Sequence, residues 1–100
     1  MSSVRVTEHT DKVVLTVDGD FTFELNREFR EAYKAHAGKR CFEVDLTSAH
    51  YMDSAGLGML VQLREFAGGE NACVSITGTN GTIQSILEVA NFERLFRLSA

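Results

Sequence analysis

One segment of the chain combines residue types that could do chemistry, Tyr51-Met52-Asp53-Ser54-Ala55-Gly56-Leu57-Gly58-Met59-Leu60. An aspartate and a serine stand there directly before an apolar run that suits a helix, so the Ser54 hydroxyl would lie at the helix N-terminus. The unpaired backbone N–H groups of a first helical turn and the helix macrodipole both favour an anion. The pattern therefore predicts that a phosphate on Ser54 would be tolerated. The alternative is that Asp53 or Ser54 only caps the helix.

The same helix is apolar on nearly every side. Its apolar residues form two stripes, Leu57, Leu60 and Val61 on one and Gly56, Met59 and Leu63 on the other. One sheet face cannot easily bury both stripes, so either a partner protein covers the second or the helix packs on two sides within the domain. Gly56 and Gly58 each cost a helix ~1 kcal/mol relative to alanine, which indicates close approach by another surface. We expect Met59 to face a partner and Leu60 to lie in the core.

Enzyme and metal signatures are missing from the sequence. There is no phosphate-binding loop that ends in Gly-Lys-Ser or Gly-Lys-Thr, and Gly56-Leu57-Gly58 lacks the third glycine of a dinucleotide fingerprint. No Gly-x-Ser-x-Gly turn surrounds Ser54. His9, His36 and His50 lack the spacing of four that a helical metal site uses. We expect no enzymatic activity, no metal, no cofactor and no small-molecule substrate.

Composition limits the remaining classes. A chain of 100 residues, 44% hydrophobic and 24% charged, is sufficient for one domain over residues 1–100. Ten basic and fourteen acidic residues give a net charge of -4, which argues against a nucleic-acid partner. The longest apolar stretch, Ala55 to Val61, is far shorter than the ~20 residues that span a bilayer, and Met1 to Lys12 has no signal-peptide core. We expect a cytoplasmic protein without membrane insertion.

The two cysteines, Cys41 and Cys73, show no pattern of a disulfide framework or a metal site. They stand far apart, with neither a Cys-x-x-Cys motif nor a Cys-His cluster. Free cysteines are usually buried, so we expect both to be small core residues.

Hydrophobic periods of two and of 3.6 alternate along the chain, which predicts strands alternating with helices. The predicted elements are a hairpin of strands at Val4–Val6 and Lys12–Val17, a helix at Glu24–Ala37 stopped by Gly38, a strand at Cys41–Leu46, a loop at Thr47–Asp53, a helix at Ser54–Ala67, a strand at Ala72–Ile76, a helix through Ile83–Ala90 behind Asn80 and Thr82, and a strand at Leu95–Leu98. The order β-β-α-β-α-β-α-β favours the α/β class, with helices packed on a mixed β-sheet.

At Asp53-Ser54-Ala55-Gly56-Leu57-Gly58 the sequence resembles the STAS domain family, and more narrowly the bacterial anti-sigma factor antagonists. The family hallmark is Asp-Ser-Ser/Ala-Gly-Leu-Gly at the start of a helix that follows a central strand. The resemblance extends to Val44-Asp45-Leu46, to the Gly19-Asp20 turn, and to Ile86-Leu87 followed by Phe92 to Leu98. It implies a single STAS-like domain over the whole chain.

The resemblance also implies a partner-switching function. In that family a partner that is both anti-sigma factor and serine kinase phosphorylates the serine matching Ser54, and a serine phosphatase removes the phosphate. The unphosphorylated antagonist binds the anti-sigma factor and frees the sigma factor. The family's binding surface is the first half of the motif helix with the loop before the first helix. The matching residues are Asp53, Ser54, Gly56, Met59, Asp20, Phe21 and Thr22.

The sequence departs from the family pattern at two places, and two other functions are alternatives to partner switching. Ala55 stands where many members carry a second serine, and the chain ends near Leu98 where many members continue into another helix. The main alternative is a STAS subunit that binds the ATPase of a lipid-transporting ABC complex, against which the Asp-Ser-Ala-Gly motif argues. A domain that senses a nucleotide or small ligand is the third possibility, and no Gly-rich phosphate loop supports it.

Overall fold

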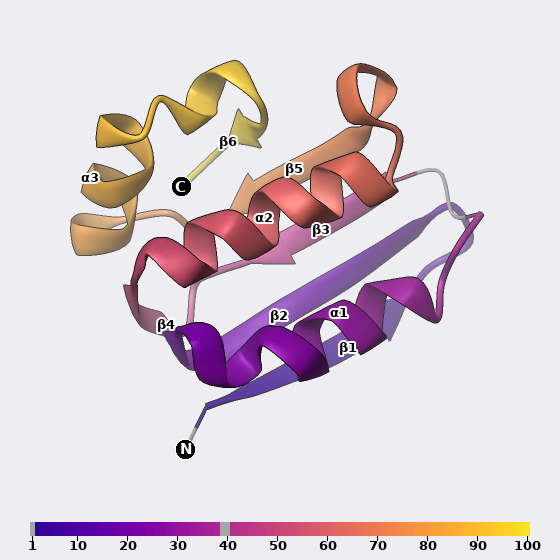
Figure 1. Cartoon of the computed structure of the whole chain (residues 1–100), viewed down its shortest axis with the longest axis horizontal. Helices are drawn as coiled ribbons and strands as arrows, with labels where there is room; N and C mark the ends of the chain where they lie inside the picture. Colours follow the sequence, from indigo (N-terminus) through magenta and orange to yellow (C-terminus); the bar gives the residue numbers. More distant parts are fainter. Residues whose placement is uncertain (1, 39–40) are drawn as a thin grey trace.

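The computed structural model describes residues 2–38 and 41–100. In these residues six strands form one sheet, and three α-helices and three short 3-10 helices connect them (Figure 1). The strands are β1 Ser3–Glu8, β2 Lys12–Phe21, β3 Cys41–Asp45, β4 Ala49–Met52, β5 Cys73–Thr77 and β6 Arg97–Leu98. The α-helices are α1 Asn26–Lys34, α2 Ser54–Phe66 and α3 Gly81–Val89, and the 3-10 helices are η1 Phe23–Leu25, η2 Gly69–Asn71 and η3 Phe92–Arg94. The predicted α/β class is confirmed.

The sheet combines one hairpin with parallel crossovers. Its order is β1-β2-β3-β5-β6, and β4 pairs with the end of β2 beside this path. β1 runs antiparallel to β2, whereas all the other pairs are parallel. Parallel neighbours need long connections, and the helices supply them. Because α2 follows β3 and β4, its first residue lies at the end of the sheet where β2 and β3 finish.

The prediction of a loop at Thr47–Asp53 was wrong, because part of it forms β4. The strand pairs with Gly19 to Phe21 of β2 beyond an irregularity in register between Gly19 and Asp20. Its first and last residues, Ala49 and Met52, are buried and the two between them are exposed. A strand normally alternates between its faces, so this pattern carries no period of two and could not be recognised in the sequence.

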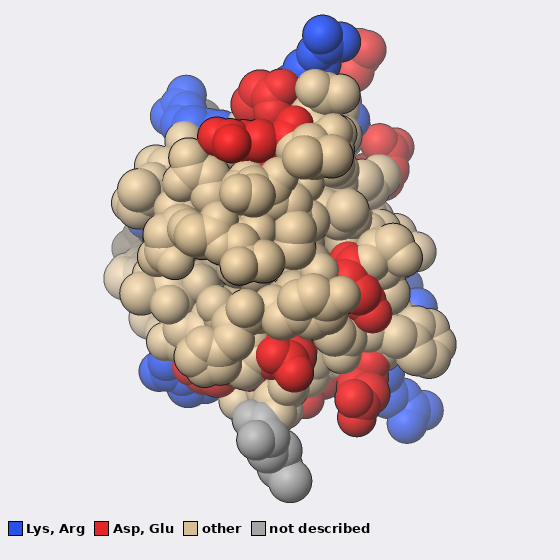
Figure 2. Space-filling view, turned by 90° about the vertical axis from the view of Figure 1, so that its left-hand side faces the viewer, with Lys and Arg blue, Asp and Glu red and all other residues tan. Residues whose placement is uncertain are grey.

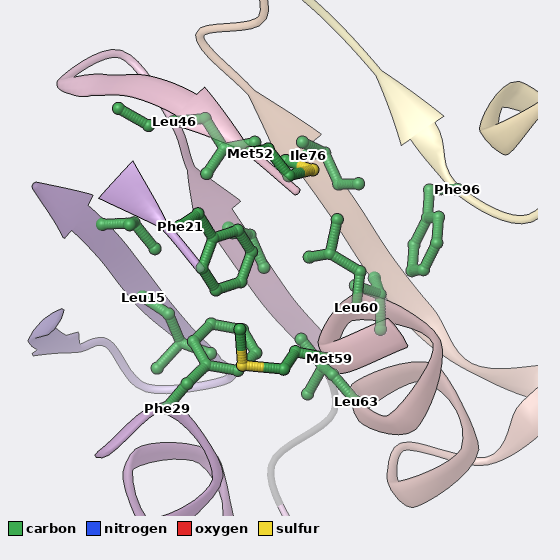
Figure 3. Close-up of a cluster of buried hydrophobic side chains, with 14 of the residues drawn as sticks. Leu15, Phe21, Phe29, Leu46, Met52, Met59, Leu60, Leu63, Ile76 and Phe96 are labelled. Carbon is green, nitrogen blue, oxygen red and sulfur yellow. The ribbon is translucent and has the colours of Figure 1, made fainter. Parts of the chain in front are cut away.

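The core lies between the sheet and the pair of helices α1 and α2, which lie side by side over one of its faces (Figure 1). Alternate residues of β2, β3 and β5 point toward these helices: Val13, Leu15, Val17, Phe42, Val44, Val74 and Ile76. Figure 3 shows Leu15 and Phe21 meeting Phe29 of α1 and Met59 and Leu63 of α2. Burying side chains of this size stabilises the fold by ~1.5 to 3 kcal/mol each, before the loss of conformational entropy.

A row of aromatic rings crosses this core from one end of the sheet to the other. The ring of Phe21 lies 5.0 Å from that of Phe29, which lies 5.6 Å from that of Tyr33. Tyr33 in turn lies 5.0 Å from Phe66 at the end of α2, and Phe66 lies 6.3 Å from Phe42. Ring contacts at these distances stabilise by ~0.5 to 1.5 kcal/mol beyond the area they bury. The row therefore fixes α1 against both the sheet and α2.

The prediction that both cysteines are free core residues was wrong. Cys41 and Cys73 form a disulfide, with their Cα atoms 4.7 Å apart. They are register partners at the first positions of β3 and β5, on the face of the sheet turned away from α1 and α2. Cys73 is exposed and Cys41 is half-buried. Their separation of 32 residues hides this proximity in the sequence, because it arises only from the pairing of two strands.

The two edges of the sheet differ in length. β6 contains two residues, whereas β1 contains six. The backbone N–H of Val4 on β1 donates to the Glu28 carboxylate of α1, at 2.8 Å. Arg5 of the same strand pairs with Asp18 of β2, with 2.8 Å between Nε and Oδ2. Among the described residues, no helix combines the length and apolar character needed to cross a bilayer.

Candidate functional site

The start of α2 presents Ser54 to solvent. Asp53 precedes the helix in an extended conformation, and its Oδ1 accepts a hydrogen bond from the Gly56 N–H at 3.0 Å. Asp53 is therefore the N-cap, while Ser54 is the first helical residue and is exposed. The N–H groups of Ser54 and Ala55 belong to a first turn that has no intrahelical acceptors for them. A dianion on Ser54 would meet these N–H groups and the positive end of the helix dipole.

Gly56 holds this first turn against the sheet. It is buried, and a Cβ atom at this position would overlap the backbone carbonyl oxygen of Phe21 and lie 2.7 Å from Cγ of Met52. No side chain therefore fits between α2 and the ends of β2 and β4. Gly58, two residues further on, faces open space. The predicted close approach is thus found at Gly56 and not at Gly58.

The second part of the predicted site is the end of β2 and the turn that follows it. Asp20 is exposed, and Thr22 is half-buried in an extended conformation before η1. The strand pairs Asp20 with Tyr51 and Phe21 with Met52, which brings the turn beside the residues that enter α2. The structure therefore joins the two separate sequence segments, residues 20–22 and 53–54, at one end of the sheet.

Three of the predicted partner contacts have no accessible side chain. Phe21 is fully buried, Met59 is 3% exposed, and Gly56 is buried under the sheet end. The expectation that Met59 faces a partner was wrong, because the side of α2 that carries Gly56 and Met59 packs on the sheet together with Leu60. Phe21, Gly56 and Met59 are instead buried residues that hold the end of β2 and the start of α2 in place. Asp53, Ser54, Asp20 and Thr22 remain as surface residues.

The open side of α2 is the one that carries Leu57 and Val61, both half-buried. Leu57 and the residues Ser85, Ile86, Val89 and Ala90 of α3 and its end line an apolar groove of about 340 Å³. Val89 is 84% exposed. The predicted division into two stripes was wrong, because Leu60 is buried together with Gly56, Met59 and Leu63 and only Leu57 and Val61 stay half-buried. The prediction that Leu60 lies in the core is confirmed.

Two exposed aromatic residues beside the site were missed in the sequence. Tyr51 of β4 is 48% exposed and is the register partner of Asp20, and Phe23 is 70% exposed directly after Thr22. Aromatic side chains are enriched where protein interfaces gain most of their free energy. Their outward direction depends on β4 and η1, neither of which the sequence pattern predicted.

The face that carries this site is mostly uncharged. Figure 2 shows neutral residues over most of it, with Asp and Glu side chains scattered across it and Lys and Arg at its outline. Near the end of β2, Arg5 donates hydrogen bonds to the Asp18 carboxylate and thereby lowers the pKa of Asp18 below its ordinary value. Within the described part of the chain, no cluster of three or more His, Cys, Asp and Glu side chains could hold a metal ion.

Comparison with known proteins identifies the family. The family model described as "Mlab, STAS domain" matches residues 4–98 of the chain. The chain belongs to the STAS family. A STAS-domain containing protein of Pseudomonas aeruginosa (strain UCBPP-PA14) is 42% identical to this STAS domain over 89 residues, which are 88% of both chains.

Solved structures share the fold of this STAS domain at low sequence identity. An anti-sigma factor antagonist from Mycobacterium paratuberculosis superposes with a TM-score of 0.86 at 18% identity, covering 99% of this chain and 86% of the other. The STAS domain of a SulP transporter from Vibrio cholerae superposes with a TM-score of 0.74, also at 18% identity, covering 94% of this chain and 77% of the other. The same fold thus occurs in a regulator and in a transporter.

Proposed function

We propose that this STAS domain is an anti-sigma factor antagonist that acts by partner switching in the cytoplasm. It has no catalytic role: the unphosphorylated domain binds an anti-sigma factor that is also a serine kinase. Phosphorylation of Ser54 releases the domain, and a serine phosphatase restores it. The observation that carries the proposal is the position of Ser54, exposed at the first residue of α2 while Asp53 already provides the cap.

The local geometry supports phosphorylation with little effect on the fold. The Asp53 carboxylate is engaged with the Gly56 N–H, so the cap does not depend on the Ser54 hydroxyl. A phosphate adds about 1.5 to 2 negative charges at pH 7, and it would point to solvent. Bringing that charge, beside Asp53, into a desolvated interface is costly. The phosphate would therefore weaken partner binding and leave the stability of the domain nearly unchanged.

The proposed interface extends on both sides of Ser54. Asp20 and Thr22 lie at the end of β2, and the exposed rings of Tyr51 and Phe23 offer apolar contact there. On the other side of α2, the apolar groove at Leu57 continues the surface toward α3. A partner that covers this face buries neutral residues and meets carboxylates, so basic residues on the partner would complement it.

The experiment has two steps. The tagged domain is isolated from its native host, its intact mass is measured, and the proteins that co-purify are identified. Binding of Ser54→Ala and Ser54→Asp to the identified kinase is then compared with wild type. We expect Ser54→Ala to bind and accept no phosphate, and Ser54→Asp to bind poorly with an unchanged circular dichroism spectrum.

A matched control tests whether the effect of the Ser54→Asp charge on binding depends on its position. Ser75→Asp places the same charge on β5, on the face of the sheet away from α1 and α2, and should bind like wild type. If Ser54→Ala is still phosphorylated by the kinase, or if Ser54→Asp binds as tightly as wild type, Ser54 is not the switch.

The second candidate function is a STAS subunit that binds the ATPase of a lipid-transporting ABC complex. The STAS domain of a SulP transporter has the same fold, and this observation favours a transport-associated role as the second candidate. The same isolation distinguishes the two functions, because a transporter ATPase without any kinase among the co-purified proteins supports the second. In that case Ser54→Asp would change ATPase binding only if Ser54 itself contacts the ATPase. The intact mass of the isolated domain would then show no phosphate.

A further inference from the structure

The Cys41–Cys73 disulfide lies at the opposite end of the sheet from Ser54, in a groove of about 340 Å³ with both polar and apolar lining. Beside the two cysteines, its lining includes Lys12, Glu43, Leu95 and Arg97. A disulfide in such a position is open to small molecules, unlike one enclosed in a core. From this placement we propose that the pair is a thiol–disulfide exchange site for an anionic low-molecular-weight thiol such as glutathione.

The direction of attack follows from the order of the strands. A thiolate attacks a disulfide sulfur in line with the S–S bond, and this bond crosses from β3 to β5. In-line approach to the Cys73 sulfur therefore comes from the β6 side, where Leu95 and Arg97 line the groove. Approach to the Cys41 sulfur would come from β2, where Lys12 is the register partner of Cys41. Since Cys73 is exposed and Cys41 half-buried, Cys73 is the sulfur attacked.

The charges of the groove suit both the incoming and the leaving group. Arg97 lies on the approach side and attracts the carboxylates of glutathione. Lys12, the register partner of Cys41, brings a cation to the leaving side of the groove, and a cation near a thiolate favours it. Glu43 pairs with Lys12 at 3.0 Å and accepts a hydrogen bond from Thr77 at 2.9 Å, so its carboxylate is held within this network.

The exchange balances in two steps. In the first, a glutathione thiolate bonds to the Cys73 sulfur, the S–S bond breaks, and Cys41 leaves as a thiolate that takes up a proton. In the second, another glutathione thiolate attacks the glutathione sulfur of the mixed disulfide and releases the Cys73 thiolate, which is then protonated. Two glutathione molecules are oxidised to glutathione disulfide, and the protein disulfide is reduced to two thiols.

The reduced and oxidised forms should share one fold. The bond joins the first residues of β3 and β5, and four further register pairs follow it, from Phe42 with Val74 to Asp45 with Thr77. The core lies on the other face of the sheet and does not include either cysteine. Opening the bond therefore removes a covalent link and leaves the strand pairing and core packing in place.

The first test uses the full wild-type chain in buffers of varied ratio of reduced to oxidised glutathione. Free thiols are alkylated with N-ethylmaleimide and counted by intact mass. We expect reversible conversion between a form with no alkylated cysteine and one with two, at an unchanged circular dichroism spectrum. A folded protein that keeps its disulfide in excess glutathione, or never forms it in oxidised glutathione, overturns the proposal.

The second test examines the roles given to the groove residues. Arg97→Gln should lower the ratio of the reduction rate with glutathione to that with uncharged 2-mercaptoethanol by about 3- to 10-fold, because one unit charge near the attacking thiol is removed. Arg94→Gln on η3 removes the same charge outside the groove and should leave the ratio unchanged. Equal effects of the two variants would show that only net charge matters and that the groove does not direct exchange.

Discussion

Replacing Gly56 and Gly58 with alanine makes the same chemical change at two positions of α2 and should have opposite effects. At Gly56 the new methyl group would overlap the carbonyl oxygen of Phe21 and approach Met52 Cγ to 2.7 Å. The carbonyl belongs to β2 and cannot move without disturbing the sheet. Overpacking of this kind destabilises a fold by ~1 to 3 kcal/mol. The higher helix preference of alanine offsets about 1 kcal/mol of this cost. At Gly58 the methyl group meets nothing within 4 Å, so only the stabilisation of about 1 kcal/mol remains.

The two variants are therefore expected to differ by ~1 to 3 kcal/mol in the free energy of unfolding, with Gly58→Ala above wild type and Gly56→Ala below it. Urea denaturation followed by circular dichroism measures this difference, and an unchanged slope shows that the unfolded state is comparable. In a domain of this size, 1 kcal/mol shifts the melting temperature by ~4 to 8 °C, so thermal unfolding provides a second readout. If Gly56→Ala is as stable as Gly58→Ala, α2 does not rest on the end of β2 as described.

Three further predictions concern the core, the disulfide and one buried tyrosine. Met59→Lys should destabilise the domain strongly in urea denaturation because it buries a charge, whereas Leu57→Lys on the open side of α2 should cost much less and instead weaken co-purification of the partner. Reducing the bond between Cys41 and Cys73 should lower the free energy of unfolding by ~3 to 4 kcal/mol, from the 32-residue separation it closes. Burial raises the pKa of Tyr33 above its ordinary value of 10.0, so the folded chain retains this proton at a pH where the unfolded chain has lost it. Stability should therefore fall as the pH rises above about 10, and Tyr33→Phe should remove part of that slope in urea titrations.

Local patterns were sufficient to predict the elements whose own residues determine them. The start of α2 at Ser54 follows from the capping aspartate and the apolar run behind it, and the hairpin of β1 and β2 follows from alternation and β-branched residues. The predicted helix at Glu24–Ala37 was longer than α1, because its first turn is 3-10 and its last residues form a turn before Gly38. These differences concern helix ends, where packing competes with weak local preferences.

The larger errors concern features that depend on residues distant in the sequence. The apolar residues of α2 that face the sheet are Gly56, Met59, Leu60 and Leu63, and the contact of Gly56 with Phe21 fixes this orientation. Helical periodicity alone does not determine which residues face the sheet in a helix that is apolar on nearly every side. β4 is a strand because β2 continues past its irregularity to pair with it, and Cys41 meets Cys73 because β3 and β5 are neighbours. The outward direction of Tyr51, and with it part of the candidate site, could be assigned only after β4 was known.

The two edge strands of the sheet affect how readily the protein can associate with copies of itself. An open sheet exposes backbone N–H and C=O groups at its outer strands, and these can recruit a strand from another molecule and lead to aggregation. Here β6 offers two residues, too few to template a stable extension. β1 is longer, but the Glu28 carboxylate occupies the Val4 N–H, and Arg5 and Glu8 place charges along the strand. Growth by edge-to-edge pairing is thereby opposed at β1 and at β6, while the end of the sheet that carries Ser54 stays exposed for the proposed partner.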